Sequence, residues 1–193
     1  MKNKKMLWET LRTRYVLNTK WLKVRKEKVK LPASKRILDD FYTIEGGRLV
    51  AVLAIDKEGG IVLVKQYRHP VKDTTIDLPG GCIEKGERPI DAAKRELAEE
   101  TGMLSGNIKK LVTYYPDSGR TDCVKHIYLA KKLKKYTGKN YPKDKNESIS
   151  LLRMPLTKLL RRMKEGKIKE ATLFVGITAY LNNYKSYKTT KAQ

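Results

Sequence analysis

Apolar and β-branched residues gather in short runs along most of the chain, and each run predicts a strand. Two of them, residues 49–55 and 61–68, are almost continuously apolar at their centres and are separated by Asp-Lys-Glu-Gly-Gly. A Gly-containing linker of this length between two such runs is typical of a hairpin. Because both runs are apolar on both faces, we expect these two strands to lie in the centre of a sheet.

More strands are predicted on both sides of this hairpin, and two helices are predicted after it. The pattern before it predicts strands at 14–17, 21–31 and 38–44, and the pattern after it predicts strands at 108–115, 124–131 and 149–154 and helices at 155–165 and 171–184. Mixed strands flanked by helices favour an α+β fold, arranged as an α/β/α sandwich.

The stretch that follows the hairpin has the signals of a helix between two loops. Ile90, Ala93 and Leu97 recur at helical spacing and form an apolar face. Pro89 suits the first turn, where its missing N–H costs little, and Gly102 suits the left-handed position that ends a helix.

The same predicted helix carries three carboxylates on one side. Glu96, Glu99 and Glu100 stand at i, i+3 and i+4, within a wedge of roughly 100°. Like charges at that spacing destabilise a helix slightly. Hard divalent cations take oxygen ligands, so we interpret the cluster as a magnesium site rather than as a solvated acidic face.

Nine positions of this stretch resemble the Nudix signature, in residue type and in spacing. They are Gly81, Glu87, Arg95, Glu96, Leu97, Glu99, Glu100, Gly102 and Met103. The resemblance implies a Nudix-type α/β/α sandwich with a mixed central sheet, and a hydrolase that acts on a diphosphate linkage.

The resemblance also implies a role for each matching residue. Glu96 and Glu100 are expected to be the main metal ligands, with Glu99 assisting and the Gly80 carbonyl as a further ligand. The expected ion is Mg²⁺, with Mn²⁺ as the alternative.

Four other positions of the signature have structural roles in the family. Glu87 and Arg95 are expected to pair and hold the loop on the helix, and Gly81 and Gly102 are the glycines that flank this unit.

Within the family, the chain resembles the ADP-ribose pyrophosphatase branch. Gln66, Tyr67 and Arg68 end the strand before the motif as in that branch, and Asp77 stands where the branch usually has a glutamate. A proline usual in the branch is Ser118 here, so the substrate stays open between ADP-ribose and a related nucleoside diphosphate sugar.

Substrate contacts and a general base follow from the same resemblance. Arg68 is the candidate for the substrate phosphates, Asp77 belongs to the same site, and Trp21 is a candidate for stacking on adenine. Glu147 matches the glutamate that serves as general base, and Glu99 is the alternative.

The resemblance divides the chain into three parts. Residues 1–47 are expected to form an N-terminal antiparallel β segment that helps to build a homodimer and reaches the substrate site, residues 48–185 the hydrolase domain, and residues 186–193 a flexible tail.

The charge of the chain leaves two other functions open. Its 43 basic and 21 acidic residues give a net charge of +22, which suits a phosphorylated substrate and also nucleic acid. The alternatives are therefore a Nudix hydrolase of RNA 5′ ends and a non-catalytic Nudix-fold binding module. No RNA-binding module is evident in the sequence, and the carboxylates are intact, so neither alternative is favoured.

Cysteine usage and apolar runs bear on the location of the protein. Two cysteines form no disulfide framework, which favours a reducing cytoplasm. The N-terminus does not have the pattern of a signal peptide, and the apolar run at 49–55 is far too short to cross a bilayer. We therefore expect a cytoplasmic protein with no membrane segment.

Overall fold

The computed structural model describes residues 6–138 and 148–184 of the 193-residue chain. The chain divides into two compact units, one made of Met1–Gly47 and Asp117–Val124 and the other of Arg48–Pro116 and Lys125–Gln193. The tail expected at 186–193 lies outside the described residues, as does Glu147.

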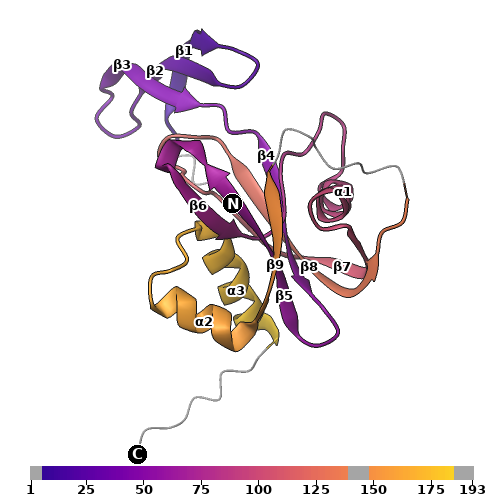
Figure 1. The fold of residues 1–193 in the computed structure, drawn as a ribbon. Helices are drawn as coiled ribbons and strands as arrows, with labels where there is room; N and C mark the ends of the chain where they lie inside the picture. The colour runs from indigo at the N-terminus through magenta and orange to yellow at the C-terminus, as the bar shows by residue number, and fades with distance from the viewer. Residues whose placement is uncertain (1–5, 139–147, 185–193) are drawn as a thin grey trace, which may run out of the picture. The chain divides into compact units, whose positions relative to one another are not determined.

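The first unit contains a three-stranded antiparallel sheet in the order β1-β2-β3 (Figure 1). The strands are β1 (Glu9–Asn18), β2 (Lys23–Lys30) and β3 (Ile37–Ile44). β1 begins five residues before the predicted start at 14, because Glu9 still pairs in register with Lys30. Pairing with β2 thus extends the strand over five residues of which only Leu11 is apolar, too weak a signal for a strand by itself.

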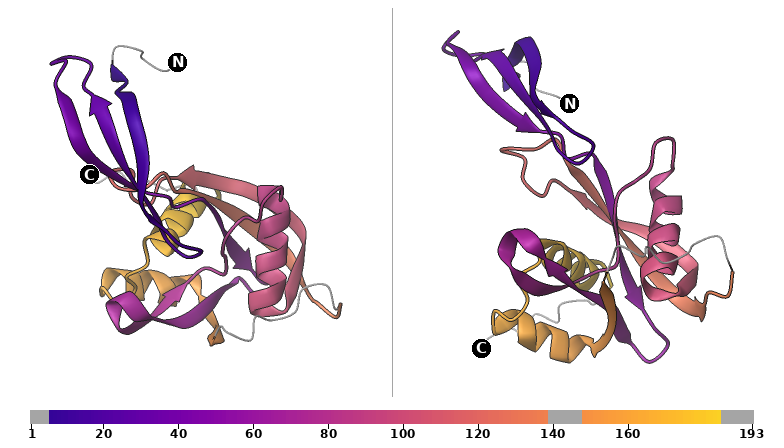
Figure 2. Two further views of the ribbon diagram at one scale, coloured as in Figure 1. Left: turned by 90° about the horizontal axis from the view of Figure 1, so that it is seen from above. Right: turned by 45° about the horizontal axis from the view of Figure 1, so that its top comes forward.

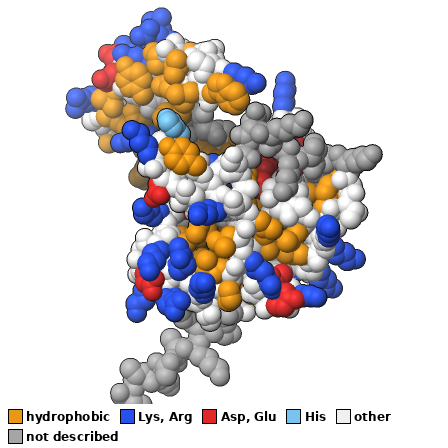
Figure 3. All heavy atoms as spheres, viewed as in Figure 1, with side chains coloured by type: hydrophobic (Ala, Val, Ile, Leu, Met, Phe, Trp, Pro, Cys, Tyr) orange, Lys and Arg blue, Asp and Glu red, His pale blue; other side chains and the backbone are white. Residues whose placement is uncertain are grey.

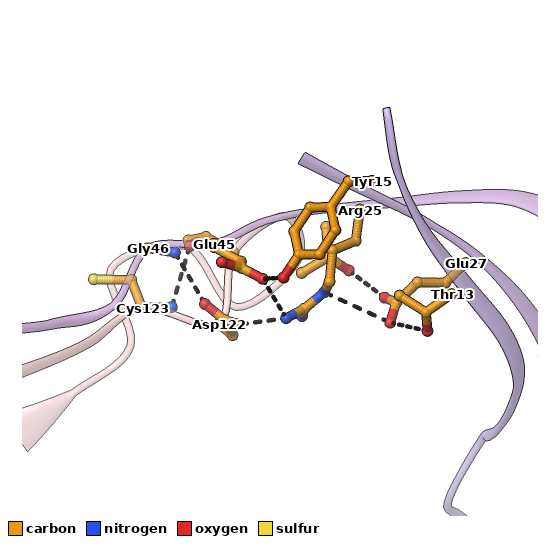
Figure 4. A network of polar contacts seen from close by, with 10 residues as sticks. Thr13, Tyr15, Arg25, Glu27, Glu45, Gly46, Asp122 and Cys123 are labelled. Atoms are coloured by element: carbon orange, nitrogen blue, oxygen red, sulfur yellow. Dashed lines mark hydrogen bonds and ion pairs between the residues drawn. The ribbon is translucent and has the colours of Figure 1, made fainter. Parts of the chain in front are cut away.

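A polar network joins the separate segment 117–124 to this sheet (Figure 4). The Arg25 guanidinium donates to Glu45 Oε1 and to Asp122 Oδ2, both at 3.1 Å. Asp122 Oδ1 in turn accepts the Gly46 N–H at 2.9 Å, and the Tyr15 hydroxyl donates to Glu45 at 2.5 Å. Side chains from β1, from β2, from the residue after β3 and from segment 117–124 therefore hold this unit together, with little apolar core.

The second unit is built on a six-stranded sheet, whose main path runs β6-β5-β4-β8-β7 with β9 paired to β5. The strands are β4 (Arg48–Ile55), β5 (Gly60–Arg68), β6 (Asp73–Asp77), β7 (Met103–Tyr114), β8 (Val124–Lys135) and β9 (Ile149–Pro155). The predicted central position of the β4–β5 hairpin is confirmed, since nearly all of β4 and the first half of β5 are buried.

The sequence did not predict β6, which follows the short 3₁₀ turn η2 (His69–Val71). Its sequence Asp-Thr-Thr-Ile-Asp has few apolar residues, so periodicity gives no strand signal. It forms because it pairs antiparallel with the second half of β5, from Val64 opposite Asp77 to Arg68 opposite Asp73.

In the part of the chain that the structure describes, three helices cover the two faces of this sheet, which confirms the predicted α/β/α sandwich (Figures 1 and 2). Val50, Val52 and Ala54 of β4 pack in a core with α1 (Pro89–Thr101). The alternate residues of β4 pack in a second core with α2 (Leu156–Lys164) and α3 (Ala171–Tyr184). The alternation along one strand therefore separates the layer of α1 from that of α2 and α3.

Within the described residues, no helix is both long enough and apolar enough to cross a membrane.

Candidate active site

Helix α1 is the platform of the site, and its sequence explains its position. Pro89 opens the helix, and Gly102 closes it at φ 66°, a left-handed conformation that glycine adopts without strain. Ala93 and Leu97 are fully buried against β4. Because one face is fixed to the sheet, Glu96 and its two acidic neighbours are held at the helix edge, half-buried.

The loop before α1 runs along β4 and is fixed to it by backbone hydrogen bonds. The Val50 N–H donates to the Gly81 carbonyl at 2.9 Å, and the Val52 N–H donates to the Pro79 carbonyl at 2.8 Å. A Cβ on Gly80 would lie 2.2 Å from the Val50 carbonyl oxygen. Glycine at this position thus allows the loop to approach the strand closely.

Two of the three carboxylates each approach one glycine of the pair Gly80 and Gly81. The Gly80 N–H donates to Glu100 Oε2 at 2.7 Å. A Cβ on Gly81 would lie 2.4 Å from Glu96 Oε1, so the Glu96 carboxylate occupies the space that a side chain there would need. The helix and the glycine pair are therefore in direct contact through Glu96 and Glu100.

Arg95 connects the acidic side of α1 with the following part of the loop. Its guanidinium donates to both oxygens of Glu87, each at 3.0 Å, and to the Cys82 carbonyl at 2.9 Å. The remaining terminal nitrogen donates to Glu96 at 2.8 Å and to Glu99 at 3.0 Å. One planar fork thus ties the loop to the helix and offsets part of the repulsion between the carboxylates.

The electrostatics of this fork are strong. The hydrogen bonds from Arg95 are the largest cause that holds the pKa of Glu87 below its usual range, and the bonds to Glu87, Glu96 and Glu99 raise the pKa of Arg95. Sequence reasoning paired Arg95 with Glu87 alone. The signal for its contact with Glu99 was the i, i+4 spacing on the helix.

The donor chemistry of this site fits a hard divalent cation, because three carboxylates and a loop carbonyl at Gly80 supply only oxygen. No three acidic, His or Cys side chains within 6–138 and 148–184 converge on one point as a formed ligand set. Glu96 and Glu99 each point an oxygen at Arg95, and Glu100 binds the Gly80 N–H.

Asp77, at the end of β6, is buried, with 7% of its surface exposed. Burial raises the pKa of Asp77 to about 6, while the Lys125 ammonium and a hydrogen bond from the Leu78 N–H act in the opposite direction. Lys125 donates to the Thr172 hydroxyl at 2.8 Å. No sequence signal pointed to this polar group, because Lys125 and Thr172 are 47 residues apart.

The remaining predicted substrate residues lie at exposed positions of their own units. Arg68 ends β5 opposite Asp73, and its side chain is exposed. Trp21, in the turn between β1 and β2, is 86% exposed.

Comparison with known proteins identifies the family. The NUDIX domain family matches residues 47–173, and the nucleoside diphosphate sugar hydrolase N-terminal domain matches residues 8–40. The chain is 31% identical to an ADP-ribose pyrophosphatase of Bacillus subtilis over 180 residues, 93% of each protein. It is also 31% identical to a methanol dehydrogenase activator of Bacillus methanolicus over 169 residues, 88% of this chain and 90% of that protein.

A solved structure shares the fold at lower sequence identity. The crystal structure of an ADP compounds hydrolase superposes with a TM-score of 0.79 at 17% identity, covering 91% of this chain and 94% of the other. The carboxylate helix, the glycine loop and the family match over residues 47–173 lead to one conclusion: the chain belongs to the Nudix family.

Proposed function

We propose that the protein hydrolyses the diphosphate linkage of ADP-ribose or a related nucleoside diphosphate sugar, giving a nucleoside monophosphate and a sugar phosphate. The observation that carries this proposal is the approach of Glu96 and Glu100 to Gly80 and Gly81. The match of residues 8–40 to the N-terminal domain of nucleoside diphosphate sugar hydrolases supports the substrate class. The name of the Bacillus subtilis relative supports ADP-ribose.

Nudix hydrolases generally use a divalent metal, and the donor set described above suits Mg²⁺, with Mn²⁺ as the alternative. Glu96, Glu99, Glu100 and the Gly80 carbonyl would hold it. When bound, such an ion neutralises charge on the diphosphate and lowers the pKa of a bound water.

The side chains of the chain itself position the reactants. Arg95, bound to Glu87, keeps the loop against α1 and so fixes where the carboxylates stand. The Arg68 guanidinium is suited to bind a phosphate through two parallel hydrogen bonds. Glu147 is the proposed general base, with Glu99 as the alternative, and either must come within hydrogen-bond reach of the attacking water.

The substrate site is proposed to be completed in a homodimer, with the N-terminal segment contributing Trp21. The Trp21 ring is exposed and could stack on adenine, and the Lys20 ammonium lies over it at 4.8 Å from the ring centroid. A cytoplasmic location stays a prediction from cysteine usage.

The function is tested by a substrate panel and one metal-ligand variant. Purified protein is incubated with ADP-ribose, other nucleoside diphosphate sugars and 5′-triphosphorylated RNA, with Mg²⁺ or Mn²⁺, and the products are separated. We expect ADP-ribose or a close relative to be cleaved to a monophosphate. Cleavage of RNA ends alone would support the first alternative function, and no cleavage of any substrate would support the binding module.

Glu100→Gln should lower kcat at least about 100-fold, because it removes a ligand charge while an amide oxygen still accepts the Gly80 N–H. Glu84→Gln is the matched control, since Glu84 is an exposed glutamate of the same loop and outside the proposed ligand set. A Glu100→Gln variant with the kcat of wild type would remove this helix from the mechanism.

Glu147→Gln separates the two candidates for general base. Loss of the base should lower kcat by about 10²- to 10⁴-fold, with a smaller effect on metal affinity. The comparison is Glu99→Gln, assayed for kcat and for Mg²⁺ dependence. If Glu147→Gln keeps a near-normal kcat and Glu99→Gln does not, with the Mg²⁺ dependence of Glu99→Gln unchanged, Glu99 is the base; a changed Mg²⁺ dependence would instead support its role as a metal ligand.

A further inference from the structure

The second unit has a basic cavity on the face opposite α1. It encloses about 700 Å³ between β5, β6, β9, α2 and the loop after α2. Five cationic side chains line it against one carboxylate: Lys65, Lys158, Arg162, Lys167, Lys169 and Asp73. A cleft walled by one sign of charge concentrates the field and attracts anions.

The apolar part of the cavity shows which side of the sheet it occupies. Met154 belongs to the core shared with α2 and α3, and Ile76 and Leu152 pack against the same core. The candidate catalytic carboxylates stand on α1, whose buried residues belong to the other core. The basic cavity is therefore separate from the site on α1.

Two of the five cations have a carboxylate within ion-pair distance, and among the described residues the other three do not, although Arg162 still adds, from farther away, to the lowering of the pKa of Glu165 that the hydrogen bond from Lys167 mainly causes. Lys169 pairs with Asp73 at 3.1 Å, and Lys167 pairs with Glu165 at 3.0 Å. Lys65, Lys158 and Arg162 form no ion pair with any residue that the structure describes. Figure 3 shows Lys and Arg side chains grouped around an apolar patch on the face that carries α2.

Arg162 distinguishes this cavity from an ordinary solvated patch of lysines. Its Nε atom is buried and has no hydrogen-bond partner among the described residues. An atom closed to water is closed to a phosphate oxygen as well, so the two terminal nitrogens of Arg162, which are not among the buried unpartnered atoms, are the donors open to a ligand. Phosphate oxygens match the guanidinium fork, and Lys158 lies one helical turn away on α2.

We infer that this cavity is a second ligand site, for a nucleoside phosphate. Its phosphates would bind Lys158 and Arg162 on α2 with Lys65 on β5, and its base would lie on the apolar floor formed by Ile76, Leu152 and Met154. The volume falls in the range of small-molecule sites, whereas nucleic acid requires an extended basic stripe.

The test measures binding of ADP to the full chain by calorimetry, with EDTA present to suppress metal-dependent binding at the carboxylate site. Adenosine, pyrophosphate and a short single-stranded RNA are the comparison ligands. We expect ADP to bind more tightly than pyrophosphate, because the floor adds apolar contact, and more tightly than adenosine, because the phosphates add charged hydrogen bonds.

The double variant Lys158→Gln/Arg162→Gln should weaken ADP binding at least about tenfold, because each charged hydrogen bond contributes about that factor. Lys110→Gln/Lys132→Gln is the matched control, since it removes two exposed positive charges from β7 and β8, outside the cavity. Hydrolytic activity of the double variant should match wild type, which also reports that it is folded.

Four results would overturn the inference. The first is that wild type does not bind ADP, and the second is that the control variant loses as much ADP affinity as the double variant. The third is that RNA binds and ADP does not, and the fourth is that a folded double variant loses both hydrolysis and ADP binding. The last would make the cavity part of the catalytic site. A chain with no hydrolytic activity on any substrate would refute the proposed function and leave the binding result interpretable.

Discussion

Asp77 is a buried acid whose ionisation works against folding. Burial raises its pKa to about 6 from an ordinary value of 3.8. A group with a raised pKa in the folded state adds stability below the unfolded value, and that stability is lost as the pH rises through the folded value. At pH 7 and above, ionised Asp77 therefore lowers the free energy of unfolding, by up to about 3 kcal/mol.

Asp77→Asn should accordingly raise the free energy of unfolding at pH 7.5 by up to about 3 kcal/mol, and change it little at pH 4. The amide oxygen still accepts the Leu78 N–H, so the local structure is kept. Lys125, Arg68 and Glu170 also bear on this pKa, and their charges are unchanged by the substitution. Urea denaturation at both pH values gives the measurement.

Asp73→Asn is the control, because it should change the free energy of unfolding at neutral pH in the opposite direction. A hydrogen bond from Lys169 lowers the pKa of exposed Asp73, so its stabilising contribution is present at neutral pH and lost in acid. Equal effects of the two substitutions at pH 7.5, or destabilisation by Asp77→Asn, would contradict the role of burial.

At the scale of single residues, the sequence was informative where a fixed spacing between residues indicates their function. Glu96, Glu99 and Glu100 were recognisable because a helix has a fixed period, and Glu87 and Arg95 because the motif has fixed intervals. Their roles as ligands stay predictions. The burial of Asp77 was not predictable, because it depends on which elements pack over the end of β6.

At the scale of elements, the contacts of Gly80 and Gly81 predict different effects for an alanine at each position. A Cβ on Gly80 would meet backbone atoms, 2.2 Å from the Val50 oxygen and 2.7 Å from the Ala51 Cα. A Cβ on Gly81 would meet the end of a side chain, 2.4 Å from Glu96 Oε1. Backbone cannot move aside cheaply, whereas a carboxylate can rotate away.

Gly80→Ala should therefore lower the free energy of unfolding, by about 1–3 kcal/mol, while Gly81→Ala should change it much less. Gly81→Ala should instead lower kcat about 100-fold, because it displaces Glu96 from the loop. Denaturation and steady-state kinetics on both variants test the pair. A stable, fully active Gly81→Ala variant would show that the position of Glu96 does not limit the reaction.

Elements with a dense apolar signal were predicted well, and those that depend on pairing were not. The range predicted for α3 agrees with Ala171–Tyr184, and β4 and β5 begin within one residue of the predicted positions. β6 and the first half of β1 were missed, since partner strands stabilise these polar segments. Hydrogen bonding across a sheet is a tertiary property that a local window of sequence does not contain.

At the scale of the whole molecule, two properties have opposite effects on the association of two copies: the positive net charge of the chain and the exposed apolar side chains of the first unit. The net charge of +22 makes two copies repel, most strongly at low salt. Yet large apolar side chains are exposed on this unit, among them Leu11 at 42% and Leu17 at 41%. Most of the large apolar side chains that are exposed among the described residues belong to this unit, so we predict that it binds a partner.

A second copy of the chain is the partner that we predict. Among the described residues of the first unit, the buried apolar side chains are Val29 and Cys123, and a three-stranded sheet with so small a core is marginal alone. Sedimentation in about 0.15 M salt should therefore give twice the 22.2 kDa chain mass. Leu11→Lys/Leu17→Lys should shift the mass toward one copy, because each substitution places a charge in the interface.

Leu151→Lys is the control for this prediction, since Leu151 is a leucine on β9 of the second unit that is 51% exposed, somewhat more than Leu11 and Leu17. It adds the same kind of charge but lies outside the proposed interface, so the dimer should persist. A wild-type chain that sediments as one copy at micromolar concentration would contradict the dimer. Dissociation of the Leu151→Lys variant alone would place the interface on the second unit. Trp21, which belongs to the first unit, could then no longer be assigned to a substrate site shared between two copies.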